Sequence, residues 1–253
     1  MVKSNREGTQ FSTGENVGLL ATGDRGLPGG RAKTADHATI ATNDAGDIYV
    51  VWSSAINGED DDVRRVEGAF FRRTALDTWK AYGTHTIAEG GSDATGWTSG
   101  AGRIYTNGGI CRKPDVVSDG DDFFVCWPRI ENSDGGGRLE CCLAEVPVSG
   151  DITVHLPSTG IGHIVDAVVD PEQAGIMPDV AWDSVNSRFG VAYCELNSKQ
   201  LTSPGTAYNF NLLATTLTFA SPSSTPTIQT PQTLHASADA SSPNINDLSF
   251  DDY

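Results

Sequence analysis

Alternating apolar and polar residues form one short phrase that recurs along this chain. Residues 178–193 read PDVAWDSVNSRFGVAY, where two alternating stretches flank a polar turn, a pattern typical of a β-hairpin. Similar phrases begin at residues 38, 114 and 243, so successive starts are separated by 76, 64 and 65 residues. The pattern therefore predicts a repeat of about 65 residues that opens with two antiparallel strands.

Each unit is expected to contain further strands after this hairpin. The expected strands are 38–42, 48–52, 68–73 and 84–88 in the first unit, 115–118, 123–127, 138–146 and 152–156 in the second, and 179–182, 189–194, 210–219 and 227–234 in the third. Pro128 is expected to end the second strand of its unit, because proline cannot donate a ladder hydrogen bond. The Gly-, Ser- and Thr-rich residues 89–110 are expected to form a loop.

Four-stranded antiparallel sheets that repeat radially are the blades of a β-propeller, so the predicted fold is all-β, a single β-propeller domain or a fragment of one. The predicted units are residues 37–112, 113–176 and 177–241, with a partial unit at 242–253. Residues 1–36 could complete a blade and close a small ring. A fragment or partial ring is favoured, because these residues hold one or two strand-like segments where three are needed. No long segment shows a sustained helical period.

The alternation also assigns side chains to faces, because successive residues of a strand point to opposite sides of the sheet. In each unit one face of the second strand carries two apolar residues and then an aromatic. The aromatic is expected to pack between neighbouring blades, a structural role that needs no ligand. The three sets are Ile48, Val50 and Trp52, Phe123, Val125 and Trp127, and Phe189, Val191 and Tyr193.

The charge of the chain limits its partners. Its 253 residues include 17 Lys and Arg against 33 Asp and Glu, a formal net charge of −16. Such a surface repels nucleic acids and anionic membranes, so neither is expected as a partner. No apolar run is long enough to insert into a membrane, and no signal-peptide pattern is visible. An extracellular or cell-surface location is favoured, with an intracellular one as the alternative.

Cysteine is sparse and its number is odd. Because there are five cysteines, at least one thiol is unpaired within the chain. Cys126, Cys141, Cys142 and Cys194 lie in strand-like segments, where reduced cysteine behaves as a small hydrophobic residue. Buried, reduced cysteines are therefore expected in preference to a disulfide framework.

The repeated unit, PDVAxD followed by an alternating strand that ends in an aromatic, resembles the repeats of sialidase-like and related bacterial β-propellers. It looks similar to the tandem propeller repeats of large bacterial surface proteins, over residues 37–253. The resemblance implies propeller architecture in a secreted, carbohydrate-binding surface protein. Sialidases carry Asp-boxes of the form S-x-D-x-G-x-T-W, of which this chain has no good copy. They also carry an Arg-Ile-Pro phrase whose arginine binds the substrate carboxylate, and Arg112-Lys113-Pro114 is its nearest match.

Two basic residues are candidate ligand-binding groups. Arg112 precedes an expected innermost strand, where it could face the channel of a ring and bind an anionic sugar. His37 occupies a similar place in the first unit. Each also has a structural interpretation, as an exposed arginine and as a strand-end histidine with a satisfied hydrogen bond.

Three aspartates near the starts of the innermost strands are weak catalytic candidates. Glycoside hydrolysis requires two carboxyl groups on either side of the scissile bond, and Asp36, Asp115 and Asp179 could converge on a ring. Asp115 and Asp179 are, however, equivalent positions in the repeat, which is typical of residues that maintain a fold.

Clustered aspartates raise the possibility of Ca²⁺, which prefers oxygen ligands. The clusters are Asp119, Asp121 and Asp122, and separately Asp60, Asp61 and Asp62. Neither lies in a twelve-residue calcium loop, and solvated turn acids are the favoured interpretation. The histidines show no zinc-ligand spacing, and no cofactor is predicted.

The preferred function is a non-catalytic binding or surface module that engages a glycan or protein through loops at one face of the ring. The alternative is a sialidase-like glycoside hydrolase with acids in the central channel. A third is a purely structural piece of a larger assembly. An incomplete ring would leave strand edges open to self-association.

Overall fold

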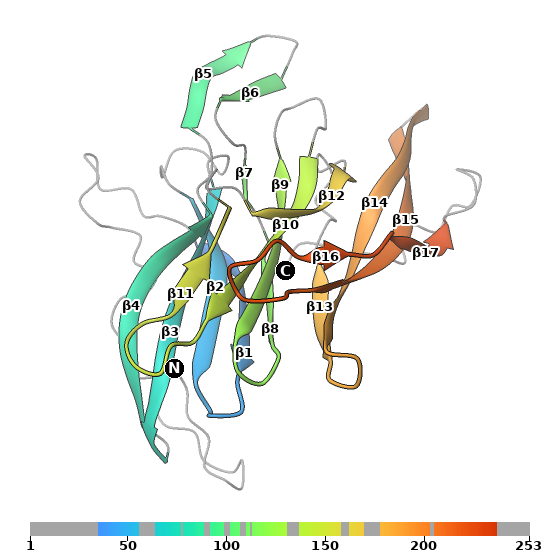
Figure 1. The fold of residues 1–253 in the computed structure, drawn as a ribbon. Coiled ribbons are helices and arrows are strands. Elements are labelled where there is room, and N and C mark those ends of the chain that lie inside the picture. Colours follow the sequence, from blue (N-terminus) through green and yellow to red (C-terminus); the bar gives the residue numbers. More distant parts are fainter. Residues whose placement is uncertain are drawn as a thin grey trace, which may run out of the picture.

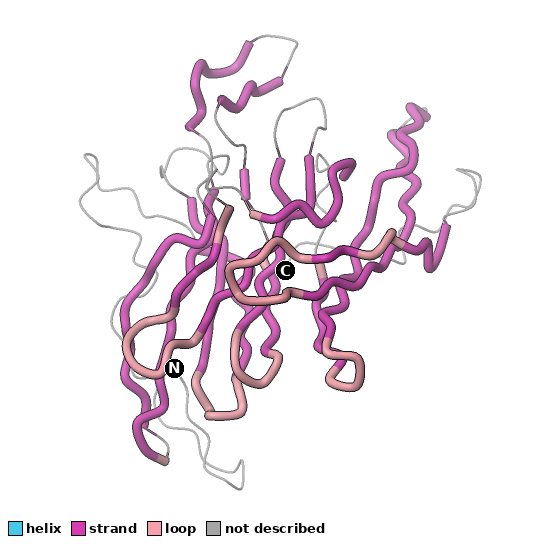
Figure 2. Tube along the Cα trace, in the orientation of Figure 1, coloured by secondary structure: helices cyan, strands magenta, loops and turns pink. Residues whose placement is uncertain are grey.

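The computed structural model describes residues 35–55, 64–76, 78–88, 92–98, 102–106, 110–111, 113–130, 137–157, 162–169, 178–202 and 205–236. These residues form strands and connecting turns, with no helix among them (Figure 2). Since none of them is helical, no helix long and apolar enough to cross a membrane occurs in this part of the chain. The prediction of an all-β fold is confirmed.

The first sheet, called sheet 1, follows the predicted plan of four consecutive antiparallel strands in the order β1-β2-β3-β4. Its strands are β1 (Ala35–Thr42), β2 (Ile48–Ala55), β3 (Arg64–Ala75) and β4 (Thr78–Ala88). Each connection that falls within the described residues is a short turn, which is why consecutive strands pair with each other.

The second sheet, called sheet 2, keeps four strand positions but divides two of them. Its strands are β7 (Ile110–Cys111), β8 (Asp115–Ser118), β9 (Phe123–Ile130), β10 (Gly137–Glu145), β11 (Thr153–His155) and β12 (His163–Val169). β7 and β8 share one edge of β9, and β11 and β12 share one edge of β10. The six strands thus occupy the four positions that the repeat predicts.

The third sheet, called sheet 3, has the same arrangement with a divided last strand. Its strands are β13 (Asp179–Asp183), β14 (Arg188–Thr202), β15 (Gly205–Thr218), β16 (Thr227–Ile228) and β17 (Gln232–Ala236). β16 and β17 both pair with β15. The three sheets stand side by side in chain order (Figure 1), and the described residues do not form a closed ring.

Two local predictions were wrong. Residues 89–110 contain an antiparallel hairpin, β5 (Ser92–Thr98) and β6 (Gly102–Thr106), where a loop was expected. Strand-forming Trp97 and Tyr105 occur within this Gly-rich stretch, and its composition concealed them. β9 continues through Pro128 to Ile130. Pro128 lies where the neighbouring edge is interrupted between β8 and β7, so a missing N–H can be tolerated there.

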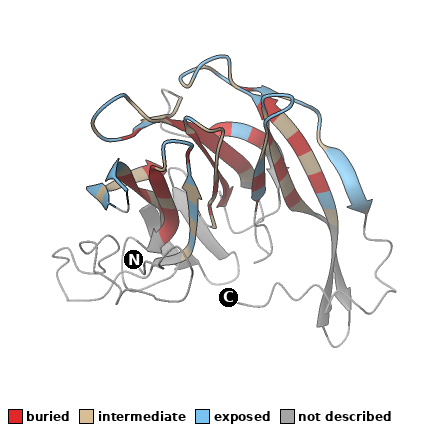
Figure 3. Ribbon diagram, turned by 90° about the horizontal axis from the view of Figure 1, so that it is seen from below, coloured by how far each residue is buried: buried red, intermediate tan, exposed pale blue. Residues whose placement is uncertain are grey.

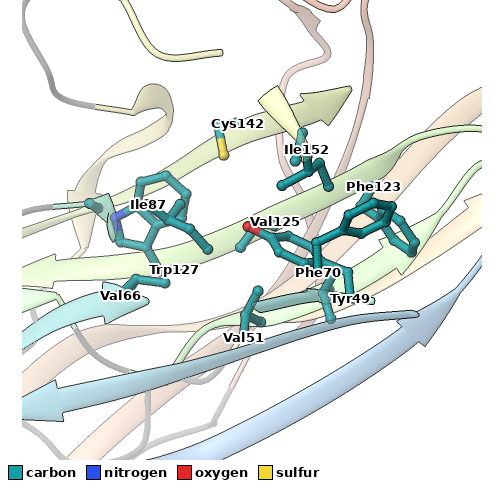
Figure 4. Close-up of a cluster of buried hydrophobic side chains, with 13 residues drawn as sticks. Tyr49, Val51, Val66, Phe70, Ile87, Phe123, Val125, Trp127, Cys142 and Ile152 are labelled. Atoms are coloured by element: carbon teal, nitrogen blue, oxygen red, sulfur yellow. The ribbon is translucent and has the colours of Figure 1, made fainter. Parts of the chain in front are cut away.

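The hydrophobic core consists mainly of two layers, one on each face of sheet 2. Phe123, Val125 and Trp127 of β9 pack with Tyr49 and Val51 of β2 in the layer between sheets 1 and 2 (Figure 4). The intervening residues of β9 point the opposite way, toward sheet 3. Buried residues accordingly follow the facing strands, whereas the turns are mostly exposed or half-buried (Figure 3).

The second layer lies between sheets 2 and 3. Phe124 and Cys126 of β9 pack there with Phe189, Val191 and Tyr193 of β14. The rings of Phe124 and Phe189 are stacked, with centroids 4.6 Å apart. Burial of a side chain of this size contributes roughly 1.5–3 kcal/mol to stability. The predicted face of the third unit, and its aromatic between neighbouring sheets, are confirmed.

The alternating set of the first unit also packs against apolar residues, on the face of sheet 1 opposite to sheet 2. Ile48, Val50 and Trp52 share the face of sheet 1 that points away from sheet 2, where they pack with Phe71 and Trp79. Equivalent residues of the three units therefore face the same direction along the stack.

Four cysteines, Cys126, Cys141, Cys142 and Cys194, form no disulfide. Cys126, Cys141 and Cys142 are fully buried and Cys194 is half-buried. Burial raises the pKa of all four thiols, because an apolar environment disfavours the thiolate. These residues act as small hydrophobic groups, as the sequence predicted.

A glycine substitution tests the packing of the layer between sheets 1 and 2. A Cβ at Gly162 would lie 2.7 Å from Cζ2 of the buried Trp127 and 2.9 Å from Cβ of Glu140. We expect Gly162→Ala to lower the free energy of unfolding by about 1–3 kcal/mol, measured by denaturant unfolding. Gly190→Ala is the matched control, because the nearest atom to its added Cβ is 3.9 Å away, and its effect should stay within about 0.5 kcal/mol. Equal effects of the two substitutions would contradict this packing.

Candidate functional site

The strands that open the repeated hairpin in each sheet, β1, β8 and β13, are connected to one another by side-chain hydrogen bonds. The hydroxyl of Thr39 donates to the carbonyl oxygen of Pro114 at 3.4 Å. The Oδ2 atom of Asp115 accepts the backbone N–H of Val180 at 2.9 Å. The start of β8 therefore lies between β1 and β13, and the three strands bring their first residues to one end of the stack.

The register shows which residues are equivalent in the three units. Thr39, Asp115 and Asp179 pair with corresponding residues of β2, β9 and β14. Thr39, and not Asp36, thus occupies the position of the two aspartates in the first unit. Asp36 lies three residues earlier in β1, opposite Ser53, so it does not share the register position of Asp115 and Asp179.

Asp115 and Asp179 lie on neighbouring strands, and the charge of Asp179 acts on Asp115. Burial is the main cause that raises the pKa of Asp115, and the negative charge of Asp179 raises it further. Hydrogen bonds from the backbone N–H groups of Val180 and Val116 lower it in part. Because each carboxylate oxygen of Asp115 already accepts one of these N–H groups, this side chain serves first to join two strands.

His37 and Lys113 share an unusual backbone conformation. Each lies two residues before the joining residue of its unit, and each has a positive φ, 51° for His37 and 43° for Lys113. The left-handed region costs a residue with a Cβ roughly 1–2 kcal/mol. Such strain is concentrated at binding sites and switch regions. Two basic residues therefore occur at one repeated, strained position at the end of the innermost strands.

The surroundings hold this conformation in place. The backbone N–H of Lys113 donates to the hydroxyl of the fully buried Ser53 at 2.8 Å. β1 has a bulge between Asp36 and Thr39, where His37 lies. His37 and Lys113 are both half-buried. Sequence reasoning missed Lys113, although its separation from His37 equals the first repeat spacing. We call the two residues, with Asp115 and Asp179, the inner-strand site.

The remaining sequence-predicted residues lie either outside the described ranges or in a turn of sheet 2. Arg112 lies outside the described residues, as do Asp60, Asp61 and Asp62. Asp119, Asp121 and Asp122 form the turn at the opposite end of β8.

The carboxylates of that turn bind backbone groups. Oδ1 of Asp119 accepts the N–H groups of Asp121 and Asp122, and Oδ1 of Asp122 accepts that of Val146. Burial raises the pKa of Asp122. The described ranges contain no group of three or more His, Cys, Asp or Glu side chains arranged to hold a metal ion.

A buried polar network in sheet 2, at the end of β9 away from the Asp119–Asp122 turn, was not predicted from the sequence. Oε1 of Glu140 accepts hydrogen bonds from Nε of Arg129 and Arg138, at 2.7 and 2.6 Å. Its Oε2 atom accepts Nε1 of Trp127 at 3.0 Å and the N–H of Gly162 at 3.3 Å. A buried ion pair does not by itself show that a protein is stabilised. Here, however, four hydrogen bonds from protein groups replace the solvent around the buried carboxylate of Glu140.

The sequence contains a signal for this network. An R-x-E phrase occurs on the third strand of two units, at residues 65–67 and 138–140. In both units its glutamate lies directly opposite the tryptophan that ends the alternating set, Trp52 or Trp127. The arginine and glutamate of the first phrase, Arg65 and Glu67, also form an ion pair. The phrase is a structural feature of the repeat and explains two of its charged residues.

Comparisons with known proteins do not place this chain in a family. No family model matches the sequence, and no curated protein matches it. Among solved structures, a family 117 glycoside hydrolase from the marine bacterium Zobellia galactanivorans matches with a TM-score of 0.39 and 12% sequence identity. The match covers 78% of this chain and 55% of that one, so this chain spans about half the length of that enzyme. A likeness of this size assigns no activity, and the sialidase-like resemblance is not shown.

The coupling between the two aspartates can be measured by NMR titration of their carboxyl carbons. We expect the pKa of Asp115 to lie above its ordinary value of 3.8, and Asp179→Asn to lower it without restoring that value, because burial is the larger cause. Since its folded-state pKa is raised, Asp115 contributes stability that is complete below the unfolded-state pKa and is lost as the pH rises through the folded-state pKa. Asp183→Asn serves as the control and should leave the pKa of Asp115 unchanged. An Asp115 pKa at or below 3.8 would contradict the described environment.

Proposed function

We propose that this chain is a β-propeller-type binding module in which sheets 1, 2 and 3 are consecutive blades. The adjacency of β1, β8 and β13 supports this architecture, because the innermost strands of neighbouring blades line the axis of a propeller. The ligand is a glycan or a protein that binds at the end of these strands.

The observation that carries the proposal is the repeated left-handed position of His37 and Lys113. Backbone strain is concentrated at binding and switch sites, and a glycine at either position would relieve it. Lys113 supplies a cation in a chain with a net charge of −16, which favours an acidic group on the ligand.

Binding without catalysis is preferred because of how Asp115 is bonded. A catalytic carboxyl group must reach the reacting atoms, whereas both oxygens of Asp115 already accept backbone N–H groups. Asp179 alone does not make the pair of carboxyl groups that glycoside hydrolysis requires.

A glycoside hydrolase is the second candidate, and one observation favours it. Asp115 has a raised pKa beside the exposed Asp179, an arrangement in which one carboxyl group could act as an acid and the other as a base or nucleophile. Turnover of an aryl glycoside that is abolished by Asp179→Asn would establish this candidate and overturn the binding-only proposal.

The test of the binding proposal is a glycan array with the wild-type chain and Lys113→Gly, followed by calorimetry on the best ligand. Glycine adopts the left-handed conformation without strain, so the free energy of unfolding should be unchanged or slightly higher. Affinity should fall about tenfold or more, because a hydrogen bond to a charged group is lost. Lys80→Ala, a substitution of a lysine on β4, is the matched control and should bind as the wild type does. Equal affinity of Lys113→Gly and the wild type would contradict the proposal.

A further inference from the structure

The face of sheet 3 that points away from sheet 2 differs from its counterparts in the other units. We call it the outer face of sheet 3. In sheet 1, Tyr49 lies opposite Phe70, and in sheet 2, Phe124 lies opposite Leu143. Each pair is buried beneath the next sheet in the stack.

The equivalent pair in sheet 3 is small and polar. Gly190 lies opposite Thr216 at this position of the outer face. The next pair along the face, Ala192 opposite Ala214, is also small. At these two pairs the outer face of sheet 3 therefore lacks the bulky apolar side chains that pack against the next sheet in sheets 1 and 2.

A groove of about 570 Å³, within the range of small-molecule sites, lies beside these pairs and is lined in part by Ala214 and Thr216. The space above Gly190 is open, since the nearest atom to an added Cβ is the Ala181 carbonyl oxygen at 3.9 Å. One cation, several hydroxyl and amide groups and one aliphatic side chain line the groove. Its lining includes Arg188, Thr216, Gln229, Thr230, Gln232 and Leu234.

Arg188 is the cationic side chain of this groove and favours a negatively charged ligand. It immediately precedes the alternating set of its unit, where the other two units have the acids Asp47 and Asp122. Oδ2 of Asp183 holds Nε of Arg188 at 2.9 Å, and the side chain of Arg188 is 43% exposed.

Further hydrogen bonds fix the turn that carries Asp183. Asp183 also accepts the N–H groups of Val185 and Asn186 and the side-chain amide of Asn186. Hydrogen bonds from Asn186 and Arg188 lower the pKa of Asp183 to about 2, so it is ionised at neutral pH. Because Nε is the atom that Asp183 holds, the two terminal nitrogens of Arg188 can donate to a ligand.

We propose that the outer face of sheet 3 binds a short acidic saccharide, with the guanidinium of Arg188 on its carboxylate. Thr216, Gln229 and Gln232 provide hydroxyl and amide groups for the sugar hydroxyls, and Leu234 provides an apolar contact for the ring. A second copy of this chain fits less well, because the face lacks the bulky pair that receives a sheet elsewhere. This site is separate from the inner-strand site and goes beyond the proposed function.

NMR titration of the wild-type chain with trigalacturonate tests the proposal directly. We expect backbone amide shifts at Arg188, Thr216 and Gln232, and much weaker binding of a neutral galactose trisaccharide. Arg188→Met should weaken binding of trigalacturonate about ten- to hundredfold, because it removes charge-assisted hydrogen bonds. Arg72→Met is the matched control, since Arg72 bonds carbonyl groups of the β10–β11 connection, and it should bind as the wild type does.

A second substitution acts by filling space. Gly190→Phe places in sheet 3 the residue that sheet 2 carries at the equivalent position, and it should abolish binding while Arg188 stays in place. Amide shifts at Arg188, Thr216 and Gln232 report binding on this face, whereas shifts at His37, Lys113 and Asp115 report binding at the inner-strand site, so failure of one site is distinguishable from failure of the other.

Three results would overturn the proposal. The first is the absence of amide shifts on the outer face of sheet 3 in the wild-type chain at saturating trigalacturonate. The second is equal affinity for the neutral trisaccharide or for Arg188→Met. The third is a wild-type dimer, seen by sedimentation, that Gly190→Phe dissociates, because a second copy would then occupy this face.

Discussion

The burial of both faces of sheet 2 is the constraint on which the rest of the structure depends. Every residue from Phe123 to Arg129 is buried, because alternate side chains of β9 enter two different layers of the core. The run of apolar residues in FFVCW is thus a strand covered on both sides rather than a strand with one wet face. Sheets 1 and 3 then have defined positions, one on each face, and the chain order of the units becomes their order in space (Figure 1).

That stacking places β1, β8 and β13 next to one another and generates the inner-strand site. Once the sheets are stacked, the joining residues Thr39 and Asp115 can reach the backbone of the next unit. The same geometry brings the strained His37 and Lys113 to one end. Residues that the repeat keeps constant, such as Asp115 and Asp179, lie on the strands that hold the stack together, whereas Lys113 and Arg188 differ from their counterparts in the other units.

Much of the fold could be predicted from the alternation of side chains, since a strand buried on both sides or on one side leaves a direct record in the sequence. The strands at residues 48–52, 123–127 and 189–194 and their faces followed from it. The divided outer strands and the continuation through Pro128 could not, because they depend on which neighbouring edge is occupied. The two proposed sites were harder to predict from the sequence. The backbone strain at Lys113 and the missing bulky pair at Gly190 appear only when the units are compared by strand register.

A double-mutant cycle on adjacent residues of β9 tests the stacking most directly. Phe123 approaches Tyr49 of sheet 1, with ring centroids 5.4 Å apart, whereas Phe124 stacks on Phe189 of sheet 3 at 4.6 Å. Denaturant unfolding of the single and double alanine variants should give a coupling energy of about 0.5–1.5 kcal/mol between Phe124 and Phe189. Phe123 and Phe189 should be additive to within about 0.5 kcal/mol. Coupling of Phe123 to Phe189 as strong as that of Phe124 would contradict a sheet 2 buried between two neighbours.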